Sequence, residues 1–262
     1  MVSMRTSEAV LVITSRLASA ALVSSGRHDR FGRQVASNIV MAEKATSAAE
    51  FMPEHPTLRA LRDEVQRCRG CDLYRYATQA VFGEGPRSAR IALVGEQPGD
   101  EEDRQGHPFV GPAGKLLNKA LEDVGIQRSD VYVTNAVKHF KFEERGKRRL
   151  HKKPSMSEIK ACKPWLEAEM SLIKPEVIVC LGATAAQALL GPKYRLTKER
   201  GKFVEHRLAP HVTATIHPSA VLRAPDAERR HEEYRKLVAD LRGVRNLFGA
   251  KKIKNHIRPG SV

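Results

Sequence analysis

The sequence has 262 residues, of which 41% are hydrophobic and 29% are charged, as in an ordinary soluble globular chain. This composition excludes a wholly disordered chain, a collagen and a disulfide scaffold. No apolar run approaches the ~18 residues that a membrane span needs, so no membrane association is expected. Lysine and arginine outnumber aspartate and glutamate by 45 to 30, which gives a net charge of +15. A polyanionic partner is therefore the first expectation.

The positive charge is concentrated in two stretches. Residues 138–153 hold eight basic and two acidic residues, and residues 241–262 hold six basic residues and no acidic one. A basic run is usually a solvated surface, but charge this concentrated is also typical of a surface that faces phosphates. We expect a flexible extension over residues 1–50, a structured domain over 51–242 and a basic tail over 243–262.

The first 50 residues carry little specific signal. They are rich in Arg and Ser and poor in acidic residues, which is loosely similar to a transit peptide, and Met41 opens a more ordinary beginning. The apolar run at residues 9–14 is short and is followed by Arg16, so it is no convincing secretory signal. We therefore expect a reducing, cytoplasmic compartment in which the cysteines are thiolates rather than disulfides.

From residue 56 onward, segments with helical spacing alternate with short apolar runs. Helices are predicted at residues 56–67, 112–124, 157–173, 183–190 and 227–241, and strands at 90–95, 131–135, 176–181 and 212–216. This alternation predicts an α/β domain in which a parallel sheet is covered by helices on both faces.

Three segments just beyond predicted strand ends carry chemically useful side chains. They are Gly95-Glu-Gln-Pro-Gly99, Asn135-Ala-Val-Lys-His139 and His217-Pro-Ser219. In parallel sheets ligands bind beyond the carboxyl ends of the strands. Each segment alone is explained by a turn with capping residues, but their convergence at one sheet edge favours a binding site.

Two of these segments and one glycine-rich loop offer candidate ligand contacts. Glu96 and Gln97 follow a tight strand exit, where a carboxylate and an amide can face a polar ligand or simply be solvated. Phe109 lies between prolines and glycines, where it can serve as a stacking platform for a base or as a core plug. Asn135 offers the donor and acceptor that read the N3–H/O4 edge of a pyrimidine, or it ends the strand in an Asx turn.

The four cysteines are Cys68, Cys71, Cys162 and Cys180. Four thiolates suit either tetrahedral zinc or a [4Fe–4S] cluster. Alternatively, Cys162 and Cys180 are core residues of a helix and a strand. The spacing alone decides neither between a metal site and core residues nor between the two metals.

The run Lys147-Arg148-Arg149-Leu150-His151-Lys152-Lys153 places a histidine among five cations. Nearby positive charges disfavour imidazolium, so His151 is expected to be neutral at pH 7. Neutral imidazole is the nucleophilic form, and a bound phosphate backbone would bring a sugar close to it. The alternative is a passive histidine in a DNA-binding loop.

Together these motifs resemble the iron–sulfur uracil-DNA glycosylases of family four over residues 58–241, and more closely their UdgX-type branch. The resemblance rests on Cys68-x2-Cys71, GEQPGDEED (95–103), PFVGPAGKLL (108–117), VTNAVKHFKF (133–142), KRRLH (147–151), LGATAAQALLG (181–191) and HPSAVLR (217–223). Ordinary family-four enzymes have alanine in place of Gln97 and lack the Arg-rich insertion ending in histidine. The branch usually reads KRRIH, so Leu150 is a mild departure.

The resemblance implies an α/β/α sandwich of three layers around a mainly parallel four-stranded sheet. It also implies a [4Fe–4S] cluster bound by all four cysteines. Uracil would be flipped out of the stack, with Phe109 stacked on it, Asn135 reading its edge, and Gln97 and Asp100 shaping the pocket. His217 would donate to a carbonyl oxygen of the departing base. DNA-backbone contacts are expected from Lys147, Arg148, Arg149, Lys152, Lys153 and Arg223.

The UdgX-type branch further implies that His151, rather than water, attacks C1′ of the sugar, with Glu96 stabilising the cation or orienting the histidine. The protein would then act once and remain joined to the abasic site. Two alternatives stay open, a turnover glycosylase with a modified loop and a cluster-bearing module that binds uracil or single-stranded DNA without chemistry. We expect a monomer that prefers single-stranded uracil-containing DNA.

Overall fold

A computed structural model describes residues 47–249 of the chain. Most of the expected N-terminal extension and the part of the basic tail from residue 250 onward lie outside the described residues. The described part begins with the short 3-10 helix η1 (Ala48–Phe51), whose Ala48 is fully buried. It ends just after α8 (Ala227–Asn246).

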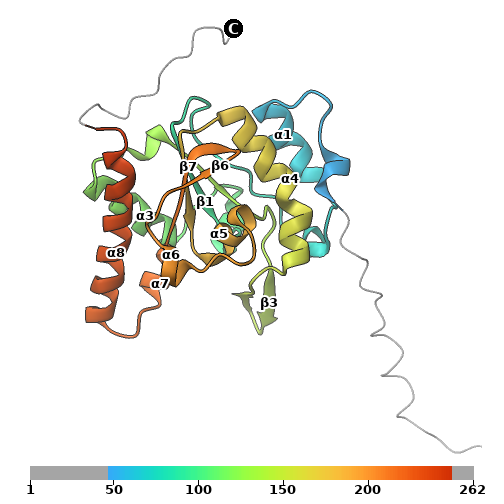
Figure 1. The fold of residues 1–262 in the computed structure, drawn as a ribbon. Helices are drawn as coiled ribbons and strands as arrows, with labels where there is room; N and C mark the ends of the chain where they lie inside the picture. Colours follow the sequence, from blue (N-terminus) through green and yellow to red (C-terminus); the bar gives the residue numbers. More distant parts are fainter. Residues whose placement is uncertain (1–46, 250–262) are drawn as a thin grey trace, which may run out of the picture. The chain divides into compact units, whose positions relative to one another are not determined.

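A five-stranded sheet in the order β2-β1-β5-β7-β6 forms the centre of the domain (Figure 1). Its parallel strands are β1 (Ile91–Gly95), β2 (Val131–Asn135), β5 (Val177–Leu181) and β7 (Ala209–Thr215). These are the four strands that the apolar runs predict, because a strand buried on both faces reads as a continuous apolar run. The fifth strand, β6 (Val204–His206), pairs antiparallel with β7 and was not predicted, since three largely exposed residues give no strand pattern.

Helices cover both faces of this sheet and confirm the three-layer α/β/α architecture. On one face α3 (Pro112–Asp123) and α8 pack through Leu117, Leu121, Leu237 and Leu241. On the other face lie α1 (Leu58–Glu64), α4 (Met156–Ile173) and α5 (Ala183–Leu190). The remaining helical segments are η2 (Val65–Arg67), η3 (Asp72–Arg75), α2 (Asp100–Gln105), η4 (Arg128–Asp130), α6 (Leu196–Glu199) and α7 (Pro218–Leu222). Within the described residues no helix is both long enough and apolar enough to cross a membrane.

The basic segment expected to be a loop is a β-hairpin. Strands β3 (Phe142–Arg145) and β4 (Arg148–His151) pair antiparallel and turn at Gly146, whose φ is +59°. Charged residues fill most of both strands, so no apolar alternation marks them as strands in the sequence. The hairpin fixes which side chains of the basic run share a face.

The order of the strands determines where a ligand can bind. The chain runs from β1 to its neighbour β2 and then crosses to β5 on the other side of β1. The connections leaving β1 and β5 therefore diverge, and a crevice forms beyond their carboxyl ends.

A tight turn before α3 depends on a glycine. Phe109 adopts φ +58°, a left-handed conformation that is uncommon for a non-glycine residue. An added Cβ at Gly114 would lie 1.7 Å from the backbone oxygen of Phe109. The loop that carries Phe109 can therefore lie on α3 only because residue 114 has no side chain.

Replacing Gly114 with alanine is expected to lower the free energy of unfolding by about 2 kcal/mol or more, because the clash is with backbone that cannot rotate away. The matched control is Gly243→Ala in α8, where the nearest atom to an added Cβ is Phe203 Cε2 at 3.9 Å. That change should raise stability by up to about 1 kcal/mol through helix propensity. Urea unfolding followed by circular dichroism measures both, and equal effects of the two changes would contradict this explanation.

Candidate active site

A cavity of about 380 Å³ opens beyond the carboxyl ends of the parallel strands. The end of each strand contributes to its wall: Glu96 after β1, Asn135 at the end of β2, Gly182 after β5 and His217 after β7. Phe109, Gln97, His151 and Arg223 complete the set of sequence-predicted residues that line it. The three predicted ligand-binding segments, at residues 95–99, 135–139 and 217–219, therefore meet at one edge of the sheet.

Asn135 presents an unsatisfied acceptor in this cavity. Its side chain is nearly fully buried, and Oδ1 has no hydrogen-bond partner among the described residues. An added Cβ at Gly95 would lie 2.2 Å from that oxygen and 2.7 Å from Cζ of Phe109, so the glycine allows the amide and the ring to approach each other. A buried acceptor without a donor costs ~1–3 kcal/mol, which a ligand N–H would recover.

The rings of Phe109 and His217 lie side by side in the wall. Their centroids are 6.0 Å apart and their planes differ by 29°. Phe109 is nine-tenths buried and is held in its strained left-handed conformation by the packing around Gly114. Strain of this kind persists where the surrounding structure over-determines it, and it often marks a functional site.

His217 is held in one tautomer. It is the N-cap of α7, and its Nδ1 accepts a hydrogen bond of 3.1 Å from the backbone N–H of Ser219. The proton of a neutral ring is therefore on Nε2. Burial first, and then the charges of Arg223 and His151, lower the pKa of His217 to about 4. At pH 7 the cavity thus contains a neutral imidazole with one N–H to donate.

His151, at the end of β4, lies beside Glu96. Its Nε2 is 3.5 Å from Oε1 of that carboxylate. Burial lowers the pKa of His151, Glu96 opposes this shift and Arg223 adds to it. The expected direction is confirmed, but its main cause is desolvation rather than the five neighbouring cations.

Gln97 connects the cavity to the hairpin. Its Nε2 donates to the backbone oxygens of Lys141 and Lys152 at 3.1 and 3.0 Å, and its Oε1 accepts from the N–H of Lys141 at 3.2 Å. The amide that we expected to contact substrate is thus occupied in joining the two ends of the hairpin. Gln97 therefore holds the base of the hairpin against the loop that follows β1.

The residues predicted to contact the DNA backbone fall into different environments. Lys147, Arg148 and Lys153 are exposed, and Arg223 lines the cavity. Lys152 is exposed but pairs with Glu143 at 2.6 Å. Arg149 differs, because its side chain is 14% exposed and paired with Asp100 and Asp103. Asp100, which we expected at the substrate, therefore contacts this arginine and is not among the residues that line the cavity.

A buried ion pair beneath Asn135 was missed in the sequence. Nζ of Lys138 donates to Glu169 at 2.5 Å, to Oγ1 of Thr134 at 2.7 Å and to the backbone oxygen of Asn135 at 2.8 Å. Lys138 and Glu169 are both fully buried. In the sequence, Lys138 is one of the eight basic residues of the segment 138–153. Its position close behind the apolar strand β2 is the one feature that sets it apart from the exposed lysines of that segment.

Three of the four cysteines meet at a second, small cavity. Its wall is formed by Ala48, Cys68, Gly70, Cys71, His139, Ala161 and Cys162. Burial raises the pKa of Cys71 to about 11 and that of Cys162 to about 12, whereas it lowers the pKa of His139 to about 4. Cys180 is fully buried in β5 and does not line this cavity.

The donor set at this second cavity fits an iron–sulfur cluster better than a single metal ion. Among residues 47–249 no three His, Cys, Asp or Glu side chains converge on one point that would hold a metal ion. The ligands of a [4Fe–4S] cluster bind separate irons and therefore stand apart. Three thiols and an imidazole line this one cavity, and they are donor types that such a cluster accepts. The tight approach of Gly70 to Ala48, where an added Cβ would lie 2.7 Å from the backbone nitrogen, shows how closely the segments fold around it.

Comparison with known proteins shows which family the chain is similar to. A family model described as the uracil DNA glycosylase superfamily matches residues 82–242. A type-4 uracil-DNA glycosylase from Thermotoga maritima is 39% identical over 184 residues, which cover 70% of this chain and 90% of that protein. One from Archaeoglobus fulgidus is 37% identical over 187 residues, 69% of this chain and 90% of the relative. A type-5 uracil-DNA glycosylase from Thermus thermophilus is 35% identical over 152 residues, 52% of this chain and 65% of the relative.

The buried neutral state of His217 predicts acid sensitivity. Its pKa falls from 6.5 to about 4 on folding, so the unfolded chain binds the extra proton between these values. The stability contribution is fully present above pH 6.5 and is lost as the pH falls toward 4, by up to about 3 kcal/mol. His217→Gln should flatten this part of the stability profile, measured by urea unfolding from pH 7 to 4.5. An unchanged pH dependence would show that His217 is not buried as a neutral ring.

Proposed function

The chain belongs to the uracil-DNA glycosylase superfamily, and from this premise we propose that it excises uracil from DNA and captures the resulting abasic site covalently through His151. The base excision is the activity carried in the names of its relatives. The capture rests on one observation above all. His151 lies in the wall of the base cavity with its Nε2 3.5 Å from the carboxylate of Glu96.

Base recognition follows from the unsatisfied acceptor of Asn135. Oδ1 accepts the N3–H of a flipped uracil, and the amide N–H donates to O4. Cytosine has no hydrogen on N3 and carries a donor in place of O4, so both contacts would fail. Phe109 supplies the flat face on which the base stacks. The cavity of about 380 Å³ has room for one pyrimidine and its sugar.

Cleavage of the glycosidic bond leaves the electron pair on uracil and a positive charge on the sugar. The Nε2–H of His217 donates to a carbonyl oxygen of the departing uracil anion, which stabilises the developing charge. The hydrogen bond from Ser219 to Nδ1 keeps that proton on the correct nitrogen. Glu96 supplies a carboxylate to the sugar cation from the loop that follows β1.

The cation is then captured by a ring nitrogen of His151. Its lone pair forms the bond to C1′, and the proton on the other ring nitrogen is released to Glu96 or to solvent. Partial desolvation and the charge of Arg223 lower the pKa of the half-exposed His151, which favours the neutral, nucleophilic ring when the cation forms. With C1′ bonded to nitrogen instead of oxygen, the protein would turn over once.

Single-stranded DNA is the preferred substrate in this proposal, because an unpaired base costs least to bring into the cavity. The exposed cations Lys147, Arg148 and Lys153 stand near the cavity on the hairpin and the segment after it, where they can hold phosphates. Monomeric state and cytoplasmic location stay predictions.

For the second cavity we propose a [4Fe–4S] cluster held by Cys68, Cys71, Cys162 and His139. This replaces Cys180, the fourth ligand in our expectation, with the imidazole that lines the same cavity. Bound there, the cluster would supply a structural cross-link between α4 and the two loops that hold the other ligands. His139 is four residues from Asn135, so this cross-link would restrain the segment that carries Asn135 into the base cavity.

The covalent step is tested with a labelled single-stranded oligonucleotide carrying one uracil. Wild-type protein should give a band of reduced mobility that survives heating in SDS and is absent with thymine. His151→Ala should lose that band and instead leave an alkali-labile site, because water replaces the imidazole. The matched control Arg148→Ala, on the opposite face of the same strand, should weaken binding but retain the covalent band.

A covalent band from His151→Ala would refute the assignment of the nucleophile. Alkali-labile cleavage without a covalent band from the wild type would indicate an ordinary turnover glycosylase. Binding without either product would favour a module that recognises uracil without chemistry.

The ligand assignment is tested by iron content and absorbance near 400 nm. Cys162→Ser and His139→Ala should each lose most of the cluster, because each removes one of four ligands. Cys180→Ser should retain it and change only the packing of β5. Loss of iron from the Cys180 variant together with retention in the His139 variant would restore the four-cysteine set.

A further inference from the structure

We propose that Arg149 is a positioning residue that clamps the β3–β4 hairpin to α2 and thereby sets the ratio of covalent capture to hydrolysis. This inference rests on the proposed role of His151 and goes beyond it. In this role Arg149 does not contact phosphate, because Asp100 and Asp103 bind its guanidinium.

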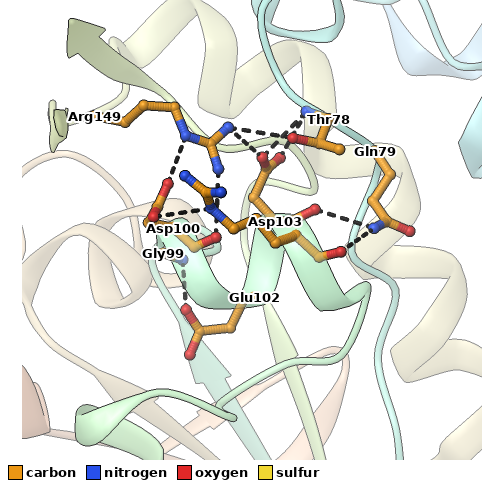
Figure 2. Close-up of polar contacts among 8 residues, drawn as sticks. Thr78, Gln79, Gly99, Asp100, Glu102, Asp103 and Arg149 are labelled. Atoms are coloured by element: carbon orange, nitrogen blue, oxygen red, sulfur yellow. Dashed lines mark hydrogen bonds and ion pairs between the residues drawn. The ribbon is translucent and has the colours of Figure 1, made fainter. Parts of the chain in front are cut away.

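Figure 2 shows the guanidinium between the hairpin and the first turn of α2. Its Nε donates to Oδ1 of Asp100 at 2.5 Å, and Nη1 donates to Oδ2 of Asp103 at 2.7 Å. Nη1 also donates to Oγ1 of Thr78 at 3.2 Å, and Nη2 to the backbone oxygen of Asp100 at 3.5 Å. One side chain therefore joins β4 to two separate segments of the domain.

Aromatic rings fix the guanidinium from the hairpin side. Its central carbon is 4.9 Å from the ring centroid of Phe142 and 5.5 Å from that of Phe140. The ring of Phe140 also lies 6.0 Å from the ring of His151. Arg149 and His151 thus share one aromatic support, and a shift of the arginine would be felt at the histidine.

The acceptor Asp103 is committed to this contact. Its side chain is fully buried and also accepts from the backbone N–H of Thr78 at 3.0 and 3.1 Å. A buried carboxylate needs both a counter-charge and hydrogen bonds. Arg149 supplies the counter-charge. The ion pair that holds the hairpin therefore also neutralises the buried carboxylate of Asp103.

The strand geometry connects the clamp to the reaction. Residues two apart in a strand point to the same side, so Arg149 and His151 share one face of β4, whereas Arg148 is exposed on the other. Arg149 meets Asp100 while His151 meets Glu96, four residues earlier in the same segment. Within residues 96–100, Glu96, Gln97 and Asp100 all contact the hairpin or its ends, and the contacts of Arg149 and His151 together define where the imidazole lies.

The alternative role as a phosphate contact is disfavoured by burial and charge. The side chain of Arg149 is 14% exposed, and two carboxylates already occupy its donors. The neighbouring Lys147, Arg148 and Lys153 are exposed and available to DNA. A misplacement of about 1 Å can reduce a reaction by up to ~100-fold, so loosening the clamp should affect capture far more than binding.

The test measures the ratio of covalent complex to free abasic product on uracil-containing oligonucleotide, together with the total uracil released. Arg149→Gln should lower that ratio about tenfold or more while total uracil release changes little. Arg149→Lys should recover part of the ratio, because it keeps the charge but not the forked geometry. Asp103→Asn should lower the ratio as well, from the opposite side of the contact. The control Arg145→Gln, at an exposed position of β3 with no assigned role in catalysis or DNA binding, should leave the ratio unchanged.

Salt dependence separates positioning from phosphate binding. On an oligonucleotide without uracil, Arg148→Gln should reduce the slope of log Kd against log salt by about 1, whereas Arg149→Gln should leave it unchanged. A reduced slope for Arg149→Gln, or an unchanged capture ratio, would overturn the proposal. A proportional loss of capture and release in all variants would also overturn it, since general destabilisation gives that result. If the wild type forms no covalent complex, the proposed function itself fails.

Discussion

The buried ion pair between Lys138 and Glu169 is the interaction on which both cavities depend. The ammonium group of Lys138 donates to the backbone oxygen of Asn135, a residue that lines the base cavity. The backbone N–H of Lys138 donates to Sγ of Cys162 at 3.3 Å, beside the cysteine cavity. Glu169 also accepts hydrogen bonds from Gly83 and Tyr132, which satisfies its other oxygen. Removing one partner of such a pair typically costs ~3–5 kcal/mol, because the other charge stays buried.

This arrangement explains how one short segment can serve two sites. Asn135 ends β2 and faces the base cavity, whereas His139 lines the cysteine cavity four residues later. Lys138 lies between them and fixes the backbone of the connection. A cluster bound at His139 and Cys162 would therefore stiffen the segment that carries Asn135.

In the proposed reaction, capture of the sugar depends on a second structural feature, the docked β3–β4 hairpin. Gln97 joins its two ends, and Arg149 holds its middle against α2. Gln97 lies in the loop after β1, which also carries Glu96, and the aspartates that bind Arg149 lie in α2 directly after this loop. The hairpin alone would place a histidine near the cavity. Its attachment to this loop brings His151 to within 3.5 Å of Glu96, the carboxylate that we propose faces the sugar cation.

The sequence predicted the four parallel strands and the location of the cavity because buried strands read as apolar runs and ligands bind at their carboxyl ends. It did not predict β3, β4 or β6, whose charged or exposed residues have no apolar pattern. For the same reason the basic run did not distinguish Arg148 from Arg149, since only a strand assigns them to opposite faces. The four-cysteine ligand set was implied by the family resemblance. Spacing does not show which side chains share a cavity, so nothing in the sequence indicated that His139 lies beside Cys68, Cys71 and Cys162.

Direct identification of the residue bonded to DNA tests the central claim. The heat-stable complex formed with a uracil-containing oligonucleotide would be digested with nuclease and protease, and the modified peptide sequenced by tandem mass spectrometry. We predict a deoxyribose adduct on His151 that is stable without borohydride reduction. An adduct on Lys147, Lys152 or Lys153 that requires reduction to survive would instead indicate an imine to an opened abasic sugar. That result would contradict capture of the sugar cation by imidazole.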